Sequence, residues 1–306
     1  MRLKRGKIRS VGMFDYDVER LRAIIRELIR SNISEEAWTW FKEKSDETAP
    51  SQINTSFSLI PRKTGKSLVS ISKDQAVQIL ELRTGFAVEG WAIDRLARVC
   101  LLMHVDPSDK DTYFKTVENL FLAAEVNELV ALYSSLPLLA YPDLWKMRCA
   151  EGVRSNMGSV MEAIMYTNPY PSQYLDEKAW NQMVLRAFFT GKDVNRIAGI
   201  DSRANRELAC VLSDYAHERW AAKRKVNPQL WRLTTRFMDG QFFSDIKKIF
   251  AEGGLREKQA AALTVFHSDY KPAKDLLNDY PDLLSEIKKN SLTWDSLALE
   301  EQGALY

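Results

Sequence analysis

Helical periodicity runs through almost the whole chain and limits its fold more than any other feature of the sequence. The clearest stretch, 176–190, carries five apolar side chains at the spacing i, i+3, i+4, i+7 and i+8: Trp180, Met183, Val184, Ala187 and Phe188. That spacing puts one apolar stripe along one side of an α-helix. Asp176 can cap the start of this helix, and Gly191 suits the position after its end.

Similar patterns predict helices along the rest of the chain. We expect them over 17–30, from 34, from 72, over 91–105, 109–122, 129–139, 205–223, 273–278, 282–289 and 293–299. The 91–105 helix is apolar on several sides and should be buried. In the helix that begins near Ser72, Val77 and Leu80 are expected to face inward. Asn205 is a suitable N-cap, and Pro272 and Pro281 stand where helices begin.

The helical pattern breaks between residues 48 and 70. Pro50, Pro61 and Gly65 stand there among Ser, Thr and Asn residues. Proline and glycine interrupt regular structure, so an irregular loop is expected over 48–70. Within it, residues 56–70 are the only place where the sequence offers a short strand.

Many helices joined by short connections indicate an all-α protein. Trp145, Trp180 and Trp220 are 35 and 40 residues apart, near the period of two-helix repeats. We therefore expect antiparallel helical pairs stacked as a HEAT-like α-solenoid, with a compact orthogonal bundle as the alternative. The expected organisation is a basic arm over 1–16 followed by a single α-helical domain over 17–306.

The overall charge of the chain is close to neutral. Lys and Arg number 43 and Asp and Glu number 41, which leaves a net charge of +2. This balance argues against nucleic-acid binding through phosphate neutralisation. The arm contains five cations, which suit a solvated tail or a contact with anionic lipid or an acidic partner: Arg2, Lys4, Arg5, Lys7 and Arg9. Since no secretory signal or spanning segment is evident, we expect a cytoplasmic protein, with peripheral contact to membrane proteins left open.

The sequence shows no complete motif for a metal or a nucleotide. Cys100, Cys149 and Cys210 are too far apart for metal-ligand spacing, and buried reduced thiols are expected. The run 64–67, Thr-Gly-Lys-Ser, is similar to the end of a P-loop, but Ile60 stands where that motif requires glycine. Glu-x-x-His pairs, typical of carboxylate-bridged metal sites in helical bundles, do not occur. We expect no cofactor.

Three charged residues at helical spacing, Arg148, Glu151 and Arg154, form the first candidate site. They suit an anion clamp, because arginine binds carboxylate and phosphate groups through two hydrogen bonds. They equally suit a salt-bridge network between helices. The turns that follow carry further candidates, which also suit capping: Asn156, Asn168 and Tyr170.

The second candidate site lies in and before the 205–223 helix. Asp201, Arg203 and Asn205 precede it, and His217 lies three residues after Asp214. Residues three apart are neighbours on a helix surface, so Asp214 could orient His217 as a general base. An exposed structural pair is the alternative.

The polar helical stretch 136–233 resembles the EboA family. The resemblance rests on the segments 141–171, 176–222 and 227–233, which include YPDLWKMRCAEGVRSN, IDSRANRELACVL and NPQLWRL. It implies a bacterial protein of a secondary-metabolite gene cluster, concerned with moving a metabolite or its precursor out of the cytoplasm. The family motif also suggests functional positions: Glu151, Arg154, Asn156, Asn168, Tyr170, Asn181, Asp201, Arg203, Asn205, Asp214, His217 and Arg219.

These observations lead to three hypotheses. The first is a non-enzymatic cytosolic scaffold or binding protein whose concave polar surface, over 148–168 and 201–219, holds a small anionic or aromatic metabolite or a protein of the same gene cluster. The second is an enzyme in which His217 is a general base oriented by Asp214, with Arg154 or Arg203 holding an anionic substrate. The third is a pure protein adaptor.

Overall fold

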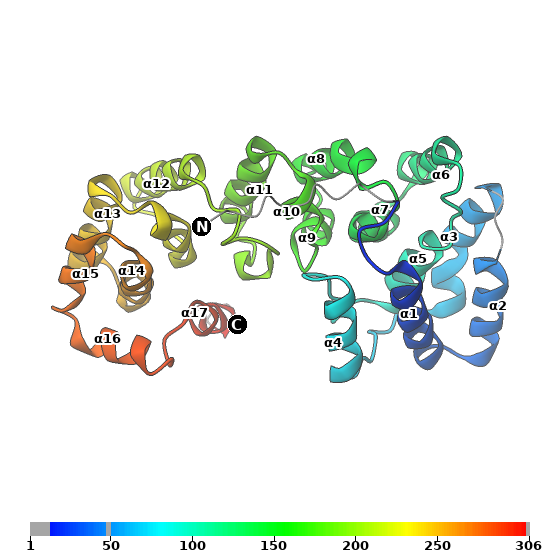
Figure 1. The fold of residues 1–306 in the computed structure, drawn as a ribbon, viewed down its shortest axis with the longest axis horizontal. Coiled ribbons are helices and arrows are strands. Elements are labelled where there is room, and N and C mark those ends of the chain that lie inside the picture. The colour runs from blue at the N-terminus through cyan, green and yellow to red at the C-terminus, as the bar shows by residue number, and fades with distance from the viewer. Residues whose placement is uncertain (1–12, 47–49, 304–306) are drawn as a thin grey trace, which may run out of the picture. The chain divides into compact units, whose positions relative to one another are not determined.

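The computed structural model describes residues 13–46 and 50–303 and folds them into α-helices and short 3-10 helices (Figure 1). Within this part of the chain the only β pairing is one isolated bridge between Leu68 and Ala92. The all-α class is therefore confirmed. Residues 1–12 of the expected basic arm lie outside the described residues.

The chain divides into two compact units, Met1–Asp176 and Glu177–Tyr306. The expectation of one domain over 17–306 stays a prediction.

The first unit is organised around one central helix. Its elements are α1 (Val18–Asn32), α2 (Glu35–Ser45), α3 (Pro50–Thr64), α4 (Lys73–Leu82), α5 (Ile93–Leu102), α6 (Lys110–Ala123), α7 (Val126–Ser135), η1 (Leu136–Leu138), η2 (Pro142–Trp145), α8 (Lys146–Arg154), α9 (Gly158–Met165) and α10 (Tyr170–Tyr174). Helix α5 packs against α1, α3 and α7, and nearly all of its residues are buried, as its apolar sequence predicts.

Helix α3 overturns the prediction of an irregular loop over 48–70 for residues 50–64, whereas 65–70 form no helix, as expected. Ile53, Phe57 and Ile60 form a buried stripe that the surrounding polar residues obscure in the sequence. Pro61 lies inside the helix and has no N–H to donate to the Phe57 carbonyl four residues earlier. The buried Arg98 side chain of α5 donates its Nε–H to that carbonyl instead, at 3.0 Å. A tertiary contact thus replaces the hydrogen bond that proline removes.

The inward direction predicted for two residues of α4 is wrong. Val77 is 52% exposed and Leu80 is 48% exposed, whereas Ile79 is buried. Successive helical residues point about 100° apart, so a contact face centred on Ile79 turns its neighbours toward solvent. The N-cap of this helix is Ser72, whose hydroxyl accepts from Gln75 N at 3.2 Å.

The second unit is also organised around a central helix. Its elements are α11 (Glu177–Phe189), η3 (Val194–Arg196), α12 (Arg206–Ala221), η4 (Pro228–Phe237), α13 (Gly240–Glu252), α14 (Leu255–His267), α15 (Lys271–Leu277), α16 (Pro281–Lys288) and α17 (Trp294–Gly303). Helix α14 packs against η4, α13, α15, α16 and α17, and its small residues at 260–262 are fully buried. Small side chains allow neighbouring helices to approach it from several sides.

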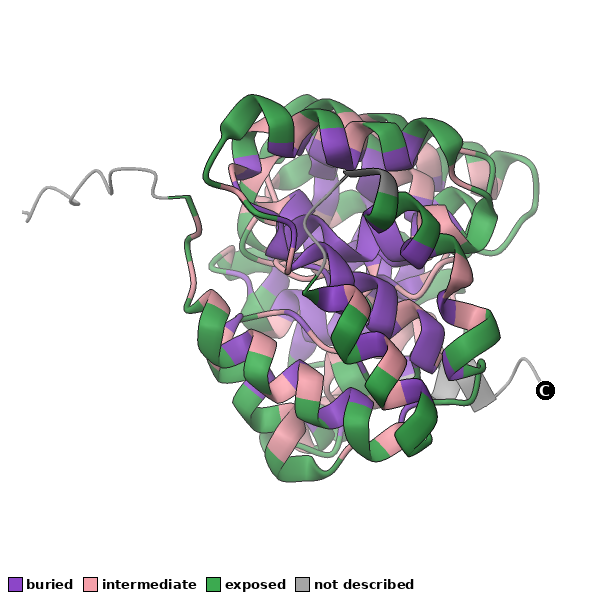
Figure 2. Ribbon diagram, turned by 90° about the vertical axis from the view of Figure 1, so that its right-hand side faces the viewer, coloured by how far each residue is buried: buried purple, intermediate pink, exposed green. Residues whose placement is uncertain are grey.

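Several predicted helix boundaries are confirmed. Asn205 is the N-cap of α12, and Gly191 follows α11 in the left-handed region with φ of 64°. Helix α16 begins at Pro281, as expected. Buried positions line the helix faces turned toward neighbouring helices, and exposed positions line the outer faces (Figure 2). Among residues 13–46 and 50–303, none of the helices has the length and apolar content that crossing a bilayer requires.

Two of the three cysteines are buried, as expected. Cys100 and Cys149 are inaccessible, whereas Cys210 is partly exposed, and all three are free thiols. Burial raises the pKa of Cys100 to about 12, because the thiolate would lose its hydration. The Cys100 thiol is therefore unreactive in the folded protein.

Candidate functional site

The guanidinium of Arg148, on α8, is held by two carboxylates. Its Nε donates to Glu118 Oε1 at 2.9 Å, its Nη1 donates to Glu151 Oε2 at 2.9 Å, and its Nη2 makes a second bond to Glu118. The hydrogen bonds and charge of Glu118 raise the pKa of Arg148. Arg148 therefore joins α8 to α6 as a salt-bridge network does, and an anionic ligand would have to displace Glu118.

The end of α8 is shaped by a close helix contact. Arg154 is the last residue of α8 and Asn156 lies in the turn after it, both exposed. Gly152, two residues earlier, is buried. A Cβ atom there would lie 2.4 Å from Ile164 Cδ1 and 2.5 Å from Tyr133 Cε1. Side chains of α9 and α7, rather than a ligand, therefore occupy the space that this glycine leaves.

Asn168 and Tyr170 are buried and bonded to backbone groups. Asn168 Nδ2 donates to the carbonyls of Tyr133 at 3.1 Å and Ala163 at 2.9 Å, and its Oδ1 accepts from Tyr170 N at 3.0 Å. The Tyr170 hydroxyl donates to the Pro142 carbonyl at 2.6 Å, and burial raises the pKa of this tyrosine. These side chains hold α7, η2, α9 and α10 together.

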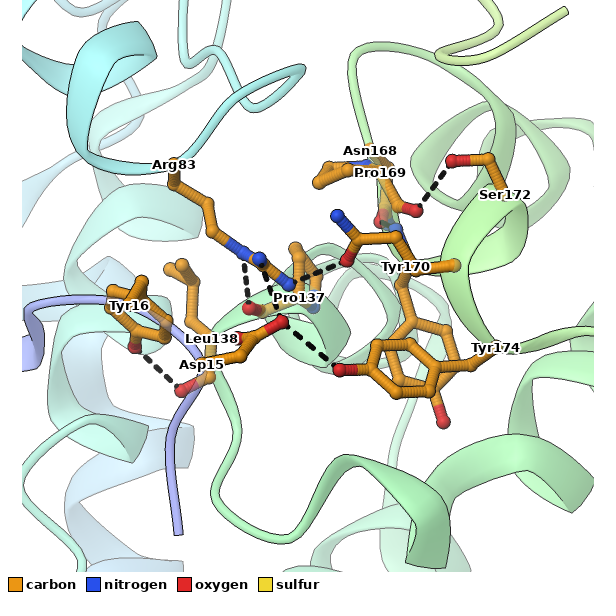
Figure 3. Close-up of polar contacts among 11 residues, drawn as sticks. Asp15, Tyr16, Arg83, Pro137, Leu138, Asn168, Pro169, Tyr170, Ser172 and Tyr174 are labelled. Atoms are coloured by element: carbon orange, nitrogen blue, oxygen red, sulfur yellow. Dashed lines mark hydrogen bonds and ion pairs between the residues drawn. The ribbon is translucent and has the colours of Figure 1, made fainter. Parts of the chain in front are cut away.

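Beside them lies a buried arginine that the sequence did not single out. Arg83 Nε donates to the Pro137 carbonyl at 2.9 Å, Nη2 donates to Gln173 Oε1 at 2.8 Å, and Nη1 donates to Asp15 Oδ2 at 3.0 Å (Figure 3). The Tyr174 hydroxyl donates to the same Asp15 oxygen at 3.0 Å. No local pattern marks Arg83, because its partners lie 54, 68 and 90 residues away in the sequence.

His104 is held in one neutral form. Its Nε2 lies 2.8 Å from Arg26 Nη1, and its Nδ1 lies 2.8 Å from the Cys100 carbonyl. A guanidinium only donates and a carbonyl only accepts, so Nε2 is the acceptor and Nδ1 carries the proton. Burial lowers the pKa of His104 to about 4, because the charged ring would lose its hydration.

In the second unit, Asn181 and Asn205 form a reciprocal amide pair. Asn205 Nδ2 donates to Asn181 Oδ1 at 2.8 Å, and Asn181 Nδ2 donates to Asn205 Oδ1 at 3.2 Å. The same Asn205 oxygen accepts from Leu208 N at 2.8 Å, which caps α12. The pair therefore joins α11 to the first turn of α12.

Asp201 holds a second arginine, Arg232 of η4. Arg232 Nε donates to Asp201 Oδ1 at 2.5 Å, its Nη2 binds the other carboxylate oxygen, and its Nη1 donates to Asn195 Oδ1 at 2.6 Å. The amide nitrogen of Asn195 donates to the Trp294 carbonyl at 3.4 Å, and Gln229 Nε2 donates to that carbonyl at 3.0 Å. Asn195 thus fixes both the guanidinium of Arg232 and the start of α17.

A hollow of about 250 Å³ opens beside this network. We call it the Arg232 hollow. It is lined by polar and aromatic side chains from η4, α14, α17 and the turn before α12: Asp201, Arg232, Thr235, Arg236, His267 and Trp294. The Thr235 hydroxyl oxygen is buried and has no hydrogen-bond partner within the described part of the chain.

His217 has a different partner from the one expected. Its Nε2 lies 2.6 Å from Asp245 Oδ1, on α13, and Ser213 Oγ donates to Asp245 Oδ2 at 2.7 Å. The His217 side chain is 48% exposed, whereas that of Asp245 is 5% exposed. Asp214 is exposed on the helix surface. The local pairing of His217 with Asp214 is therefore wrong, because the buried Asp245 carboxylate is the group that reaches the imidazole.

The remaining two arginine candidates each lie near a ring. The guanidinium carbon of Arg203 lies 5.0 Å from the centroid of a Trp180 ring, and that of Arg219 lies 5.9 Å from the Tyr215 ring. Arg219 Nε also donates to the Lys225 carbonyl at 2.8 Å, across the turn that ends α12. This bond ties the last turn of α12 to the segment that follows the helix.

The comparison with protein families agrees with the resemblance seen in the sequence. The family model described as "Metabolite traffic protein EboA" matches residues 21–235, which is most of the chain. The chain belongs to the EboA family. Searches of curated proteins and of solved structures each found no match.

All the candidate positions fall within the EboA match, but they divide between the two units. The first unit contains Arg148, Glu151, Arg154, Asn156, Asn168 and Tyr170. The second contains Asn181, Asp201, Arg203, Asn205, Asp214, His217 and Arg219. Within the described residues, no group of three or more His, Cys, Asp or Glu side chains is arranged to hold a metal ion.

One of the missed partners does carry a signal in the sequence. Asp245 lies between Phe242, Ile246 and Ile249, which share one buried face of α13. A carboxylate on an apolar face must find a polar partner when it is buried. Its position therefore predicts a buried hydrogen bond, although it does not name His217 as the partner.

Proposed function

We propose that this EboA-family chain is a non-enzymatic helical binding protein or scaffold. It holds a small anionic or aromatic metabolite, or a protein of the same metabolite route, and so supports the synthesis and export of a secondary metabolite or its precursor. The family description supports a role in metabolite traffic. The Arg232 hollow is the observation that supports metabolite binding.

The binding groups of this hollow are held in place before a ligand arrives. Asp201 binds two nitrogens of Arg232, and Asn195 bonds both to that guanidinium and to the Trp294 carbonyl. The guanidinium carbon lies 6.0 Å from the Trp294 ring centroid. Fixed groups lose little entropy on binding, so a rigid arginine beside an indole favours a ligand with both a ring and a polar group.

The other polar groups at the hollow favour a negatively charged ligand. Asp201 neutralises Arg232, but no ion pair of Arg236 occurs among the described residues. The exposed His267 adds a ring nitrogen, which can donate to a ligand oxygen beside Arg236. We therefore assign the hollow to an anionic metabolite with an aromatic part.

The larger architecture and cell location remain part of this proposal. Successive helices that pack on one another, such as α1 on α2 and α13 on α14, support stacked HEAT-like pairs. We place the protein in the cytoplasm, in contact with proteins of the metabolite route and at most peripherally with membrane proteins. Small-angle X-ray scattering of the whole chain tests the architecture, since a compact orthogonal bundle gives a smaller radius of gyration.

Native mass spectrometry of the gently purified protein from its own host tests the binding. We expect a reproducible small-molecule adduct that is lost in Arg236→Ala. The matched control is Lys289→Ala, an exposed cation at the end of α16, which should keep the adduct. Arg154→Ala tests the candidate cation of the first unit in the same assay, with the melting temperature reporting on folding.

The outcomes separate the hypotheses. A clean apo mass with a protein copurified on the chain would refute metabolite binding and favour the adaptor. An adduct that persists in Arg236→Ala would place the metabolite outside the Arg232 hollow.

An acid–base enzyme is the second candidate, and one observation favours it. Asp245 holds His217 Nε2 at 2.6 Å while the ring is half exposed, as an oriented general base would be. If the protein is an enzyme, the wild type should carry its product, whereas His217→Gln and Asp245→Asn should carry unreacted substrate. The mass of the bound compound should therefore differ between the wild type and these two variants. Asp214→Asn should leave it unchanged, since Asp214 does not contact the imidazole. An unchanged compound in all three variants would refute catalysis at His217.

A further inference from the structure

A second hollow of the Glu177–Tyr306 unit takes no part in the proposed function. It has a volume of about 220 Å³ and lies between the end of α12, the last turns of α13 and the start of α14. We call it the Trp220 hollow. The side chains that matter for its chemistry are one aromatic wall, three cations and two carboxylates: Trp220, Lys223, Arg224, Lys248, Glu252 and Glu257.

The Trp220 ring is held in place by two other rings. The Trp220 ring stacks on the buried ring of Trp231, with centroids 5.6 Å apart and planes inclined by 19°. The His217 ring also lies 5.6 Å from the Trp220 ring, and it is fixed by the buried carboxylate of Asp245. The half-buried Trp220 indole is thus a rigid surface, and rigid aromatic surfaces bind planar groups at a low entropic cost.

The cations stand on a fixed turn and a neighbouring helix. Lys223 has a left-handed backbone, with φ of 54°, and Arg224 N donates to the Arg219 carbonyl at 2.8 Å. Lys248 projects from α13, and its Nζ lies 5.5 Å from the centroid of the Trp220 ring. Positive charge therefore surrounds the indole from two elements.

The two carboxylates at this hollow are already engaged. Glu252 Oε2 lies 3.5 Å from Lys248 Nζ, and Glu257 Oε2 accepts from Gly254 N at 2.8 Å at the start of α14. By contrast, neither Lys223 nor Arg224 makes a side-chain ion pair among the described residues. Two cations on the rim are therefore free to meet an anion.

One of the lining residues of the hollow is a glycine. A Cβ atom at Gly253 would lie 2.6 Å from the Ile249 carbonyl oxygen, so only glycine lets the chain turn there from α13 to α14. Gly253 itself lines the hollow and adds no side chain to it. A cavity of about 150 Å³ holds benzene, so about 220 Å³ admits one ring with a small substituent.

We propose that the Trp220 hollow binds a small planar anion, a conjugated ring that carries one carboxylate or phosphate group. The ring lies against Trp220, and the anionic group lies between Lys223 and Arg224. This site is separate from the Arg232 hollow and does not depend on the function proposed for it.

Isothermal titration calorimetry of the whole chain tests this site with three probes. Indole-3-acetate has a ring and an anion, tryptamine has the same ring and a cation, and acetate has the anion alone. We expect indole-3-acetate to bind and the other two to bind at least about tenfold more weakly, because each lacks one of the two contacts. Binding should weaken with added salt.

Variants locate the binding. Arg224→Glu and Lys223→Glu change exposed side chains, so the protein should fold, and each should weaken indole-3-acetate binding by about tenfold or more. Lys289→Glu is the matched charge reversal outside the hollow and should have no effect. Three results would overturn the proposal: no binding of indole-3-acetate, equal binding of tryptamine, or binding that is lost in Arg236→Ala but kept in Arg224→Glu.

Discussion

Replacing Asn205 with alanine should cost more than the loss of an ordinary helix cap. The Asn205 side chain caps α12 through Leu208 N, and it also makes two hydrogen bonds with Asn181. Removing an N-cap costs about 1 kcal/mol. Asn181 is only 7% exposed, so its amide would be left buried without its partner, which costs about 1–3 kcal/mol more. We therefore expect Asn205→Ala to lower the free energy of unfolding by about 2–4 kcal/mol.

Two variants separate these contributions. Asn205→Asp keeps the oxygen that caps Leu208 N, but it replaces the donor to Asn181 Oδ1 by a second acceptor, so it should cost about 1–3 kcal/mol without loss of the cap. Ser34→Ala removes the N-cap of α2, which accepts from Ala37 N at 3.2 Å, and should cost about 1 kcal/mol.

Urea unfolding followed by circular dichroism at 222 nm and by tryptophan fluorescence measures these differences. The reasoning fails if Asn205→Ala and Ser34→Ala lower the unfolding midpoint equally, because the amide pair would then add nothing to the cap. A ligand-binding role for Asn205 predicts the opposite pattern, with binding lost in Asn205→Ala while the midpoint stays that of the wild type.

Three further predictions follow from the first unit. Gly152→Val should destabilise the protein by about 1–3 kcal/mol, since its Cβ would lie 2.5 Å from the Tyr133 ring, and thermal melting checks this. Arg83→Met should lower the free energy of unfolding by about 3 kcal/mol and raise the rate of amide hydrogen exchange near Asp15. An unchanged exchange rate near Asp15 would contradict this prediction. His104 binds a proton less readily when folded, so its contribution to stability is complete above pH 6.5 and is lost as the pH falls toward about 4. His104→Gln should flatten that part of the pH dependence of the urea midpoint, and an unchanged slope would refute the assignment.

The helix boundaries could be read from the sequence because their causes are local. A cap such as Ser34 or Asn205 accepts a hydrogen bond from a residue three positions later, and Pro281 begins a helix because its fixed φ suits that position. Where a tertiary contact decides the local structure, the sequence pattern gives a wrong prediction. Pro61 indicates a break, yet α3 continues through it because Arg98 bonds to the freed carbonyl.

The candidate residues were found more readily than their partners. His217 and Arg148 stood out by type and position, but the carboxylates that hold them lie 28 and 30 residues away. The chain contains 41 Asp and Glu residues, so the sequence alone offers many partners for each cation. Only packing selects among them, since α13 brings Asp245 to His217 and α6 brings Glu118 to Arg148.

The sequence by itself determined the helical class, most helix boundaries and the family, because these depend on periodicity, capping and residue order within short windows. Only the tertiary structure decided which polar groups form hydrogen bonds within the protein and which line a hollow. Arg148, Asn168 and Asn205 have their hydrogen bonds filled by other helices, whereas the Arg232 and Trp220 hollows each keep cations beside an indole. Hydrogen-bond partners and cavities arise from contacts between distant segments, and no local pattern in the sequence encodes them.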